Sequence, residues 1–159
     1  GDSVVIYEGV ADSNWPLWDC CGGASFTELE DDAEHGMVAE FTFDGANATV
    51  VGFKGVNSID ASSSGTFEFD FKMTAAPPAD GLWTLKVESN SDVFAELLLS
   101  ESNEGVAPAM DTWQHFTFNV SELAIAGLNT SDVNIIMVFP TWSKAQGAAF
   151  RIDNVVFKP

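Results

Sequence analysis

Basic residues are scarce in this sequence. It has 6 lysines and arginines against 24 aspartates and glutamates, which gives a formal net charge of −18. Nucleic acids and anionic lipid surfaces both bind proteins through Lys and Arg side chains. We therefore expect no nucleic acid and no membrane partner, and strongly anionic polysaccharides are disfavoured for the same reason. A neutral ligand or a cation suits this charge better.

Cysteine and histidine are also rare. The two cysteines, Cys20 and Cys21, are adjacent, so they cannot join distant parts of the chain, and free thiols and a vicinal disulfide both remain open. The two histidines, His35 and His115, form no HxH or HxxxH pair. GxSxG and phosphate-binding glycine motifs are missing as well. No apolar run approaches the roughly 20 residues that a membrane-spanning helix needs.

The most enzyme-like string is Glu30-Asp31-Asp32-Ala33-Glu34. In some β-sandwich glycosidases an ExDxE strand places two carboxylates on one face for catalysis. Such a strand needs apolar residues between its acids, whereas here Asp31 intervenes and Gly36 follows soon after. We expect this string to form a turn, and the chain not to be an enzyme.

Hydrophobic residues make up 46% of the 159-residue chain, which suits one domain over residues 1–159. Alternation with a period of two dominates, as in Thr66–Met73, where Phe67, Phe69, Phe71 and Met73 face one way. Only 121–127 resembles a helical turn. About ten short antiparallel strands in two packed sheets are predicted: 3–7, 24–30, 37–43, 48–53, 66–73, 82–88, 93–99, 113–120, 133–139 and 149–157.

Three short motifs carry a resemblance to a known group of domains. They are Ile6-Tyr7-Glu8-Gly9, the turn Asp31–Gly36 leading into Met37–Phe41, and Thr112–Phe118 before a closing strand Phe150–Val155. This layout resembles the jelly-roll carbohydrate-binding modules of families 4, 9 and 22 and related galactose-binding-like domains. The stretch Trp18–Gly23 further resembles modules attached to marine bacterial polysaccharidases. The resemblance implies an antiparallel two-sheet jelly roll.

The resemblance also implies a structural calcium ion. Carried over, Glu8 and Asp153 would supply carboxylate oxygens, and carbonyls around His35 and Gly36 would complete the shell. Independently, Asp153 lies in phase with the apolar Val155 and Phe157, and a buried acid there needs a partner.

A sugar site needs a flat aromatic platform and a few fixed polar groups. Trp83 is in register with apolar neighbours and is expected in the core, whereas Trp113 is left open. The segment 9–23 is expected to be a long loop. We predict a platform of Trp15, Trp18 and Trp142, with hydrogen bonds from Asp19, Lys144 and Gln146. A rival location is a groove along a sheet face, lined by Glu68, Asp70, Lys72, Thr84 and Lys86.

The sequence therefore favours a non-catalytic module that binds a neutral polysaccharide, with β-glucan such as laminarin preferred. We expect it to be part of a longer secreted protein, in which it holds a linked glycoside hydrolase near its substrate. The alternative is a calcium-stabilised structural or protein-interaction β-sandwich that has no sugar site.

Overall fold

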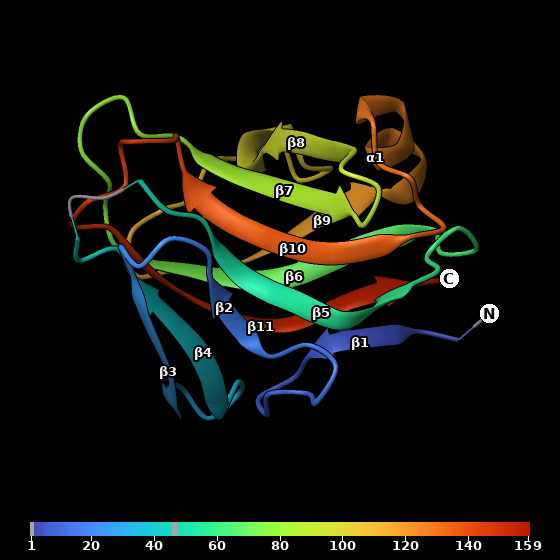
Figure 1. The fold of residues 1–159 in the computed structure, drawn as a ribbon. Coiled ribbons are helices and arrows are strands. Elements are labelled where there is room, and N and C mark those ends of the chain that lie inside the picture. Colours follow the sequence, from blue (N-terminus) through green and yellow to red (C-terminus); the bar gives the residue numbers. More distant parts are fainter. Residues whose placement is uncertain (1, 46–47) are drawn as a thin grey trace.

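The computed structural model describes residues 2–45 and 48–159 of the chain. Within these ranges the chain forms eleven strands, one short α-helix and one 3₁₀ turn (Figure 1). In chain order the elements are β1 (Val4–Tyr7), β2 (Leu17–Asp19), β3 (Ser25–Glu30), β4 (Met37–Thr42), β5 (Val51–Ile59), β6 (Thr66–Ala75), β7 (Trp83–Ser89), β8 (Phe94–Leu98), η1 (Leu99–Glu101), β9 (Trp113–Asn119), α1 (Val120–Ala126), β10 (Val133–Pro140) and β11 (Ala149–Lys158).

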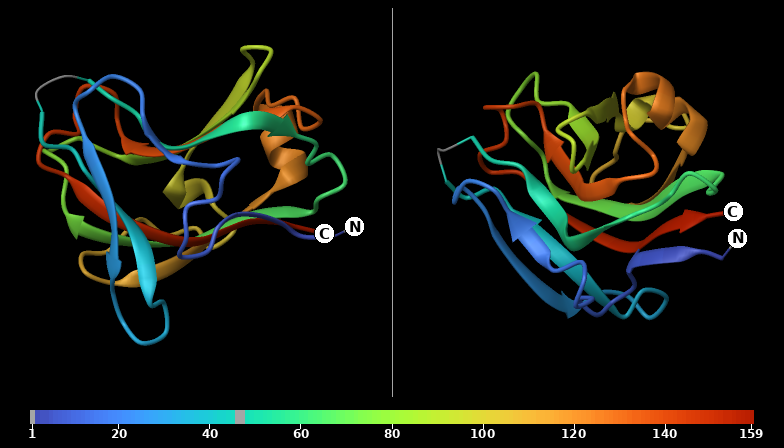
Figure 2. Two further views of the ribbon diagram at one scale, coloured as in Figure 1. Left: turned by 60° about the horizontal axis from the view of Figure 1, so that its bottom comes forward. Right: turned by 45° about the vertical axis from the view of Figure 1, so that its right-hand side comes forward.

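The strands form two antiparallel sheets packed face to face, as predicted. Sheet A has six strands, in the order β3-β4-β11-β6-β9, with β1 also paired to β11. Sheet B has five strands, in the order β2-β5-β10-β7-β8. Figure 1 shows β5, β10 and β7 of sheet B as long curved strands. Figure 2 shows the β3–β4 hairpin extending from one side of the sandwich.

Alternating side chains build the core between the sheets. Along β6 the phenylalanines Phe67, Phe69 and Phe71 are fully buried, while the residues between them are partly exposed. Phe71 stacks on Phe150 of β11 with ring centroids 5.2 Å apart. Burial of aromatic side chains supplies most of the favourable free energy of such a core. Trp83 belongs to this core, as the sequence predicts.

β11 connects the parts of sheet A. Its first half pairs with β4 and its second half with β1, while β6 runs along its other edge. The register between β11 and β6 shifts between Asp153 and Val156, and Asn154 there has a positive φ of 51°. This bulge turns Asn154 outward and leaves Asp153 buried beneath the surface.

The predicted strands agree with the structure except around β2 and β5. Residues 17–19, expected to lie in a loop, form β2 at the edge of sheet B, and the strand expected at 48–53 is Val51–Ile59. The helical turn expected at 121–127 is α1, which ends at Gly127 with φ of 127°. Within the described ranges, no helix has the length and hydrophobicity needed to cross a membrane.

Candidate functional site

The outward face of sheet B is hollowed. Core-facing residues of β7 alternate with Thr84 and Lys86, which therefore point away from the core. Their register partners on β10 are Phe139 and Met137, which must share that outward face. Yet Met137 is only 2% exposed and Phe139 only 3%. These two side chains are thus the apolar floor of a groove, with taller neighbours around them.

One wall of the groove is Trp18 on the edge strand β2. Trp18 pairs with Gly52, and Gly52 pairs with Met137, so the three lie in one row across the sheet. A Cβ atom on Gly52 would collide with the backbone carbonyl of Ile136. The row therefore has a strip without a side chain between Trp18 and the floor. Lys54 lies beside Trp18, with its Nζ 5.4 Å from the centre of the Trp18 ring.

Trp142 stands at the end of the groove where β10 leaves the sheet. Its side chain is 55% exposed. A cavity of about 320 Å³ lies against it. The cavity brings together an exposed aromatic ring, an apolar floor and several hydroxyl and carboxylate groups; its lining is Thr84, Glu96, Leu97, Leu98, Glu101, Phe139, Thr141 and Trp142. Such a combination can hold a sugar ring by its C–H face and its hydroxyl edge.

The far wall of the groove is the edge strand β8. Glu96 pairs with Lys86 across the strands, and Lys86 Nζ lies 4.2 Å from the centre of the Phe94 ring. Lys86 is also 4.0 Å from a carboxylate oxygen of Glu88. The groove thus offers a cationic and an anionic group side by side, so a neutral ligand meets both donors and acceptors.

The prediction that Trp15 belongs to the platform is wrong. Trp15 is 2% exposed and is part of the core. Residues on either side of it continue the edge of sheet B: Val56 N donates to Asn14 O at 2.8 Å, and Lys54 N to Pro16 O at 3.3 Å. The tip of the Trp15 ring lies over Gly55, where any Cβ would be crowded. Leu17 packs against the core beside it, whereas Trp18 lies in the outward-facing row with Gly52 and Met137.

Asp19 is not a free sugar ligand either, because its carboxylate is engaged within its own turn. It accepts hydrogen bonds from the Thr49 hydroxyl and from the backbone N–H groups of Cys21 and Gly22, the latter two at 3.3 and 3.0 Å. Cys20 and Cys21 form a vicinal disulfide, which settles the alternative left open by the sequence. Asp19 and the disulfide together fix the turn that follows Trp18.

Lys144 and Gln146 are exposed in the segment that follows Trp142. Lys144 Nζ lies 3.8 Å from a carboxylate oxygen of Asp80, in the loop between β6 and β7. Of the six predicted residues, Trp18 and Trp142 thus lie at the groove of sheet B.

The prediction of a rival groove along one sheet face is wrong, because its five residues belong to two different sheets. Thr84 and Lys86 are on β7 of sheet B, whereas Glu68, Asp70 and Lys72 are on β6 of sheet A. Only the first two can act with Trp142. The floor residues Met137 and Phe139 were not predicted, because they lie in an uninterrupted apolar run on β10 in which no alternation marks the outward-facing members.

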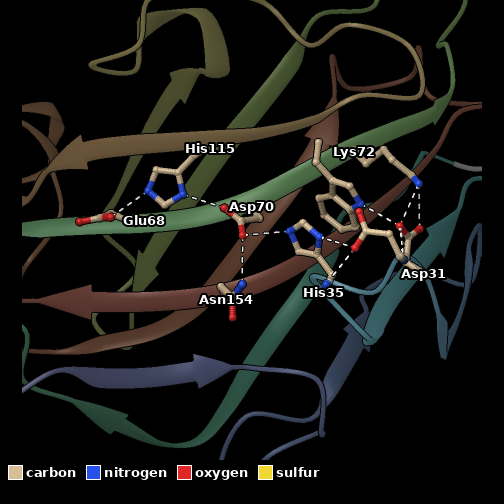
Figure 3. A network of polar contacts seen from close by, with 9 residues as sticks. Asp31, His35, Glu68, Asp70, Lys72, His115 and Asn154 are labelled. Carbon is tan, nitrogen blue, oxygen red and sulfur yellow. Dashed lines mark hydrogen bonds and ion pairs between the residues drawn. The ribbon is translucent and has the colours of Figure 1, made fainter.

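The outward face of sheet A carries a network of ion pairs instead (Figure 3). Asp31, at the end of β3, has a side chain only 3% exposed. It accepts hydrogen bonds from Lys72 at 3.0 Å, from the Trp113 indole at 2.8 Å and from Arg151. Burial alone would raise the pKa of Asp31, but these three donors outweigh it and hold the pKa well below its usual range. The string 30–34 ends β3 and forms a turn, as predicted.

Both histidines extend this network. The ring of His35 stacks on Trp113 with centroids 4.0 Å apart and bonds to Asp32 and Asp70. His115 bonds to Asp70 at 2.7 Å and to Glu68 at 2.8 Å. Burial lowers the pKa of His115, but the two carboxylates outweigh burial and leave the pKa raised. The carboxylates and imidazoles of this network are hydrogen-bonded to one another, and the network holds the β3–β4 turn against the rest of sheet A.

The residues expected to bind calcium lie near this network. Asp153 is buried, and its Oδ1 atom has no hydrogen-bond partner among the described residues. Burial, with a smaller contribution from the nearby Asp70 and Glu8 carboxylates, raises the pKa of Asp153 to about 6. The Gly36 carbonyl accepts one hydrogen bond, from Asp31 N, which leaves a second lone pair. No cluster of three or more His, Cys, Asp or Glu side chains suited to a metal occurs in the described ranges, so backbone carbonyls would have to complete a shell.

Comparison with known proteins gives matches in structure but none in sequence. No protein-family model matches the chain, and no curated protein matches it. The family 30 carbohydrate-binding module of the cellulosomal cellulase Cel9D-Cel44B of Clostridium thermocellum aligns with a TM-score of 0.71 at 16% identity, over 98% of this chain and 97% of that one.

Two further structures show the same likeness. The family 11 module from Clostridium thermocellum, solved with a β-1,3-1,4-mixed-linked tetrasaccharide, aligns with a TM-score of 0.67 at 13% identity, over 98% of this chain and 95% of that one. An exo-β-agarase aligns with a TM-score of 0.66 at 12% identity, over 98% of this chain but only 24% of the enzyme. The chain therefore has the jelly-roll fold of the carbohydrate-binding modules.

Proposed function

We propose that this domain is a non-catalytic module that binds a neutral polysaccharide in the groove of sheet B. The observation that carries the proposal is the exposed Trp142 ring beside a cavity with an apolar floor and several hydrogen-bonding side chains. Trp18 provides a second aromatic surface across the floor. A groove with one aromatic ring on its wall and another at its end suits a chain of several sugar units better than one small sugar.

The preferred ligand is a β-glucan such as laminarin. A neutral glycan meets no repulsion from a protein of net charge −18. The family 11 module of similar fold was solved with a mixed-linked tetrasaccharide, which supports a glucan. The module would tether an attached glycoside hydrolase to its substrate, because linkage raises the effective concentration of the enzyme there. The Cys20–Cys21 disulfide supports a secreted protein, since disulfides persist in oxidising compartments.

Catalysis is not proposed for this groove. A glycosidase needs two carboxylates with defined roles on either side of the scissile bond. Of the two acids at the Trp142 cavity, Glu101 accepts a 2.8 Å hydrogen bond from the Leu98 backbone and caps the turn after β8. Measurable hydrolysis of any glucan by the domain would contradict this part of the proposal.

A structural calcium ion is proposed at Asp153, Glu8 and the Gly36 carbonyl. The unpartnered Oδ1 of Asp153 fits a cation ligand, and all the donors are hard oxygens, which Ca²⁺ prefers. When bound, the ion would neutralise the buried carboxylate and join the end of β1 to β11. Its role is stability.

Affinity gel electrophoresis tests the proposed function. The domain is run in gels containing laminarin, mixed-linkage glucan, xylan, mannan or agarose, with calcium present. We expect retardation by a neutral glycan, and a loss of more than about 2 kcal/mol of binding in Trp142→Ala, as for other aromatic anchors. Phe26→Ala, which removes a 44% exposed aromatic ring from sheet A, is the matched control and should bind normally.

Three other outcomes would change the conclusion. Binding that survives Trp142→Ala and Trp18→Ala but is lost in Phe26→Ala would move the site to sheet A. Retardation by an anionic glycan alone would contradict the ligand class. Absence of retardation in every gel would favour the alternative, a calcium-stabilised structural or protein-interaction domain.

A further inference from the structure

A second cavity lies at the end of the sandwich beside the Trp142 groove. Its volume is about 310 Å³, and residues 76–82 form one wall of it. These residues are the loop between β6 and β7, which lies at one end of the sandwich in Figure 1. The floor of the cavity is made of Trp83 and Met73, whose indole Nε1 and thioether sulfur lie 3.1 Å apart. Apart from Asp80 and Ser100 its lining is apolar, with Leu82, Leu98, Ala107 and three prolines among the residues that form it.

This cavity and the Trp142 cavity share a wall. Leu98 lines both of them. Leu82, which lines the second cavity, exchanges two hydrogen bonds with Thr141, which lines the first: Leu82 N to Thr141 Oγ1 at 2.9 Å and Thr141 N to Leu82 O at 2.8 Å. Leu82 and Trp142 are each 55% exposed. A glycan lying on Trp142 would therefore have its neighbouring groups next to Leu82 and Leu98.

The lining of the second cavity selects the chemistry of its occupant. A bare sugar ring presents hydroxyls in most directions, and apolar walls leave such hydroxyls without partners. Asp80 is the one charged group in the lining, and the whole protein is strongly acidic, so sulfate and carboxylate substituents are repelled. The Trp83 indole N–H already donates to the Met73 sulfur, so among the described lining residues the exposed Ser100 hydroxyl is the neutral side-chain group left to hydrogen-bond a ligand. A small, neutral and mainly apolar substituent with one acceptor fits this set.

We propose that the second cavity takes O-acetyl groups carried by a neutral polysaccharide whose backbone lies in the Trp142 groove. The acetyl methyl group contacts Leu82, Leu98 and the proline walls, and the acetyl carbonyl accepts a hydrogen bond from Ser100. The inference rests on the proposed function, and it adds that the module discriminates acetylated from unacetylated stretches of the same glycan.

The test compares matched ligands. Acetylated glucomannan, acetylated xylan and chemically acetylated laminarin are each run beside the same preparation after deacetylation with dilute alkali. We expect at least one acetylated form to bind about tenfold more tightly than its deacetylated partner, the range that one methyl-sized group contributes in an apolar pocket. Leu82→Asn should remove this difference and leave binding of the deacetylated form unchanged. Ile125→Asn, at an 87% exposed position on α1, is the control and should preserve the difference.

A second variant keeps the test decisive if Leu82→Asn fails to fold. Ala107→Gln places a larger side chain into the cavity from an exposed loop position and should have the same effect as Leu82→Asn. Equal binding of acetylated and deacetylated forms by the wild type overturns the inference while sugar binding stands. Preference for acetylated glycan that persists in both variants also overturns it. If no glycan binds in either form, the proposed function fails and the inference fails with it.

Discussion

Replacement of Asp31 by Asn is expected to destabilise the protein more than any other change on the surface of sheet A. The Asp31 side chain is 3% exposed and accepts bonds from Lys72, Trp113 and Arg151. Removing one member of a buried ion pair typically costs about 3–5 kcal/mol, because its partners lose their counter-charge. Lys72 and Arg151 are 18% and 22% exposed and can recover some hydration, so the lower end applies.

Thermal unfolding at pH 7 measures this cost. A loss of about 3 kcal/mol corresponds to a fall in Tm of about 6–12 °C for a domain of this size. Asp32→Asn is the matched control: Asp32 is the next residue, its side chain is 46% exposed and its ion-pair partner is His35. Its Tm should change by much less.

The pH dependence of the Tm difference between wild type and Asp31→Asn is a stricter test of the role of Asp31. The folded-state pKa of Asp31 is depressed, so its stabilisation is present above its ordinary value of 3.8 and is lost as pH falls through the folded pKa. The difference in Tm between wild type and Asp31→Asn should therefore shrink below about pH 4. An Asp31→Asn variant as stable as Asp32→Asn at pH 7, or a difference that does not narrow in acid, would refute the account of the network.

Three further predictions concern the core, the histidine chain and the metal. Trp15→Ala should cost about 3–5 kcal/mol of unfolding free energy, as for other buried aromatics, whereas Trp142→Ala should leave Tm nearly unchanged, and denaturant unfolding compares the two. The pKa of His115 is raised above 6.5, so its ion pairs stabilise the fold fully below that pH and are lost as pH rises through the folded pKa; Tm should fall over this range, and less so in His115→Asn. Calcium at a hundredfold excess over its Kd should stabilise the wild type by about 2.7 kcal/mol, reversibly with EDTA, and Asp153→Asn should abolish the response.

Much of sheet A and sheet B could be predicted from the sequence because their strands alternate. β6 and β9 bury every second residue, and this periodicity is local information. β2 has three residues and no alternation long enough to detect, and it becomes a strand only by pairing with β5. Trp15 was misplaced for the same reason, since its burial depends on Gly55, forty positions away along the chain.

The candidate site was harder to predict because alternation tells which residues face outward but not which sheet carries them. Glu68 and Lys86 both alternate with core residues, yet strand order puts them on opposite sides of the sandwich. Strand order arises from pairing between distant segments, such as β7 with β10. The exposure of Trp142 could be predicted because it directly follows a strand and nothing periodic in its own segment could bury it; its role in binding stays a prediction.

The two outward faces differ in what they leave for a ligand. On sheet A, Lys72, Arg151 and both histidines already bond to carboxylates, so a sugar hydroxyl there would have to replace charge-assisted hydrogen bonds with weaker neutral ones. On sheet B, a ligand on Trp142 displaces water from an exposed aromatic ring. The indole is uncharged, so this contact requires no ion pair to break. Binding is favourable only where the new contacts exceed those lost. The same jelly roll therefore uses the outward side chains of sheet A to stabilise the β3–β4 turn, and leaves the Trp142 ring at sheet B exposed where the ligand is proposed to bind.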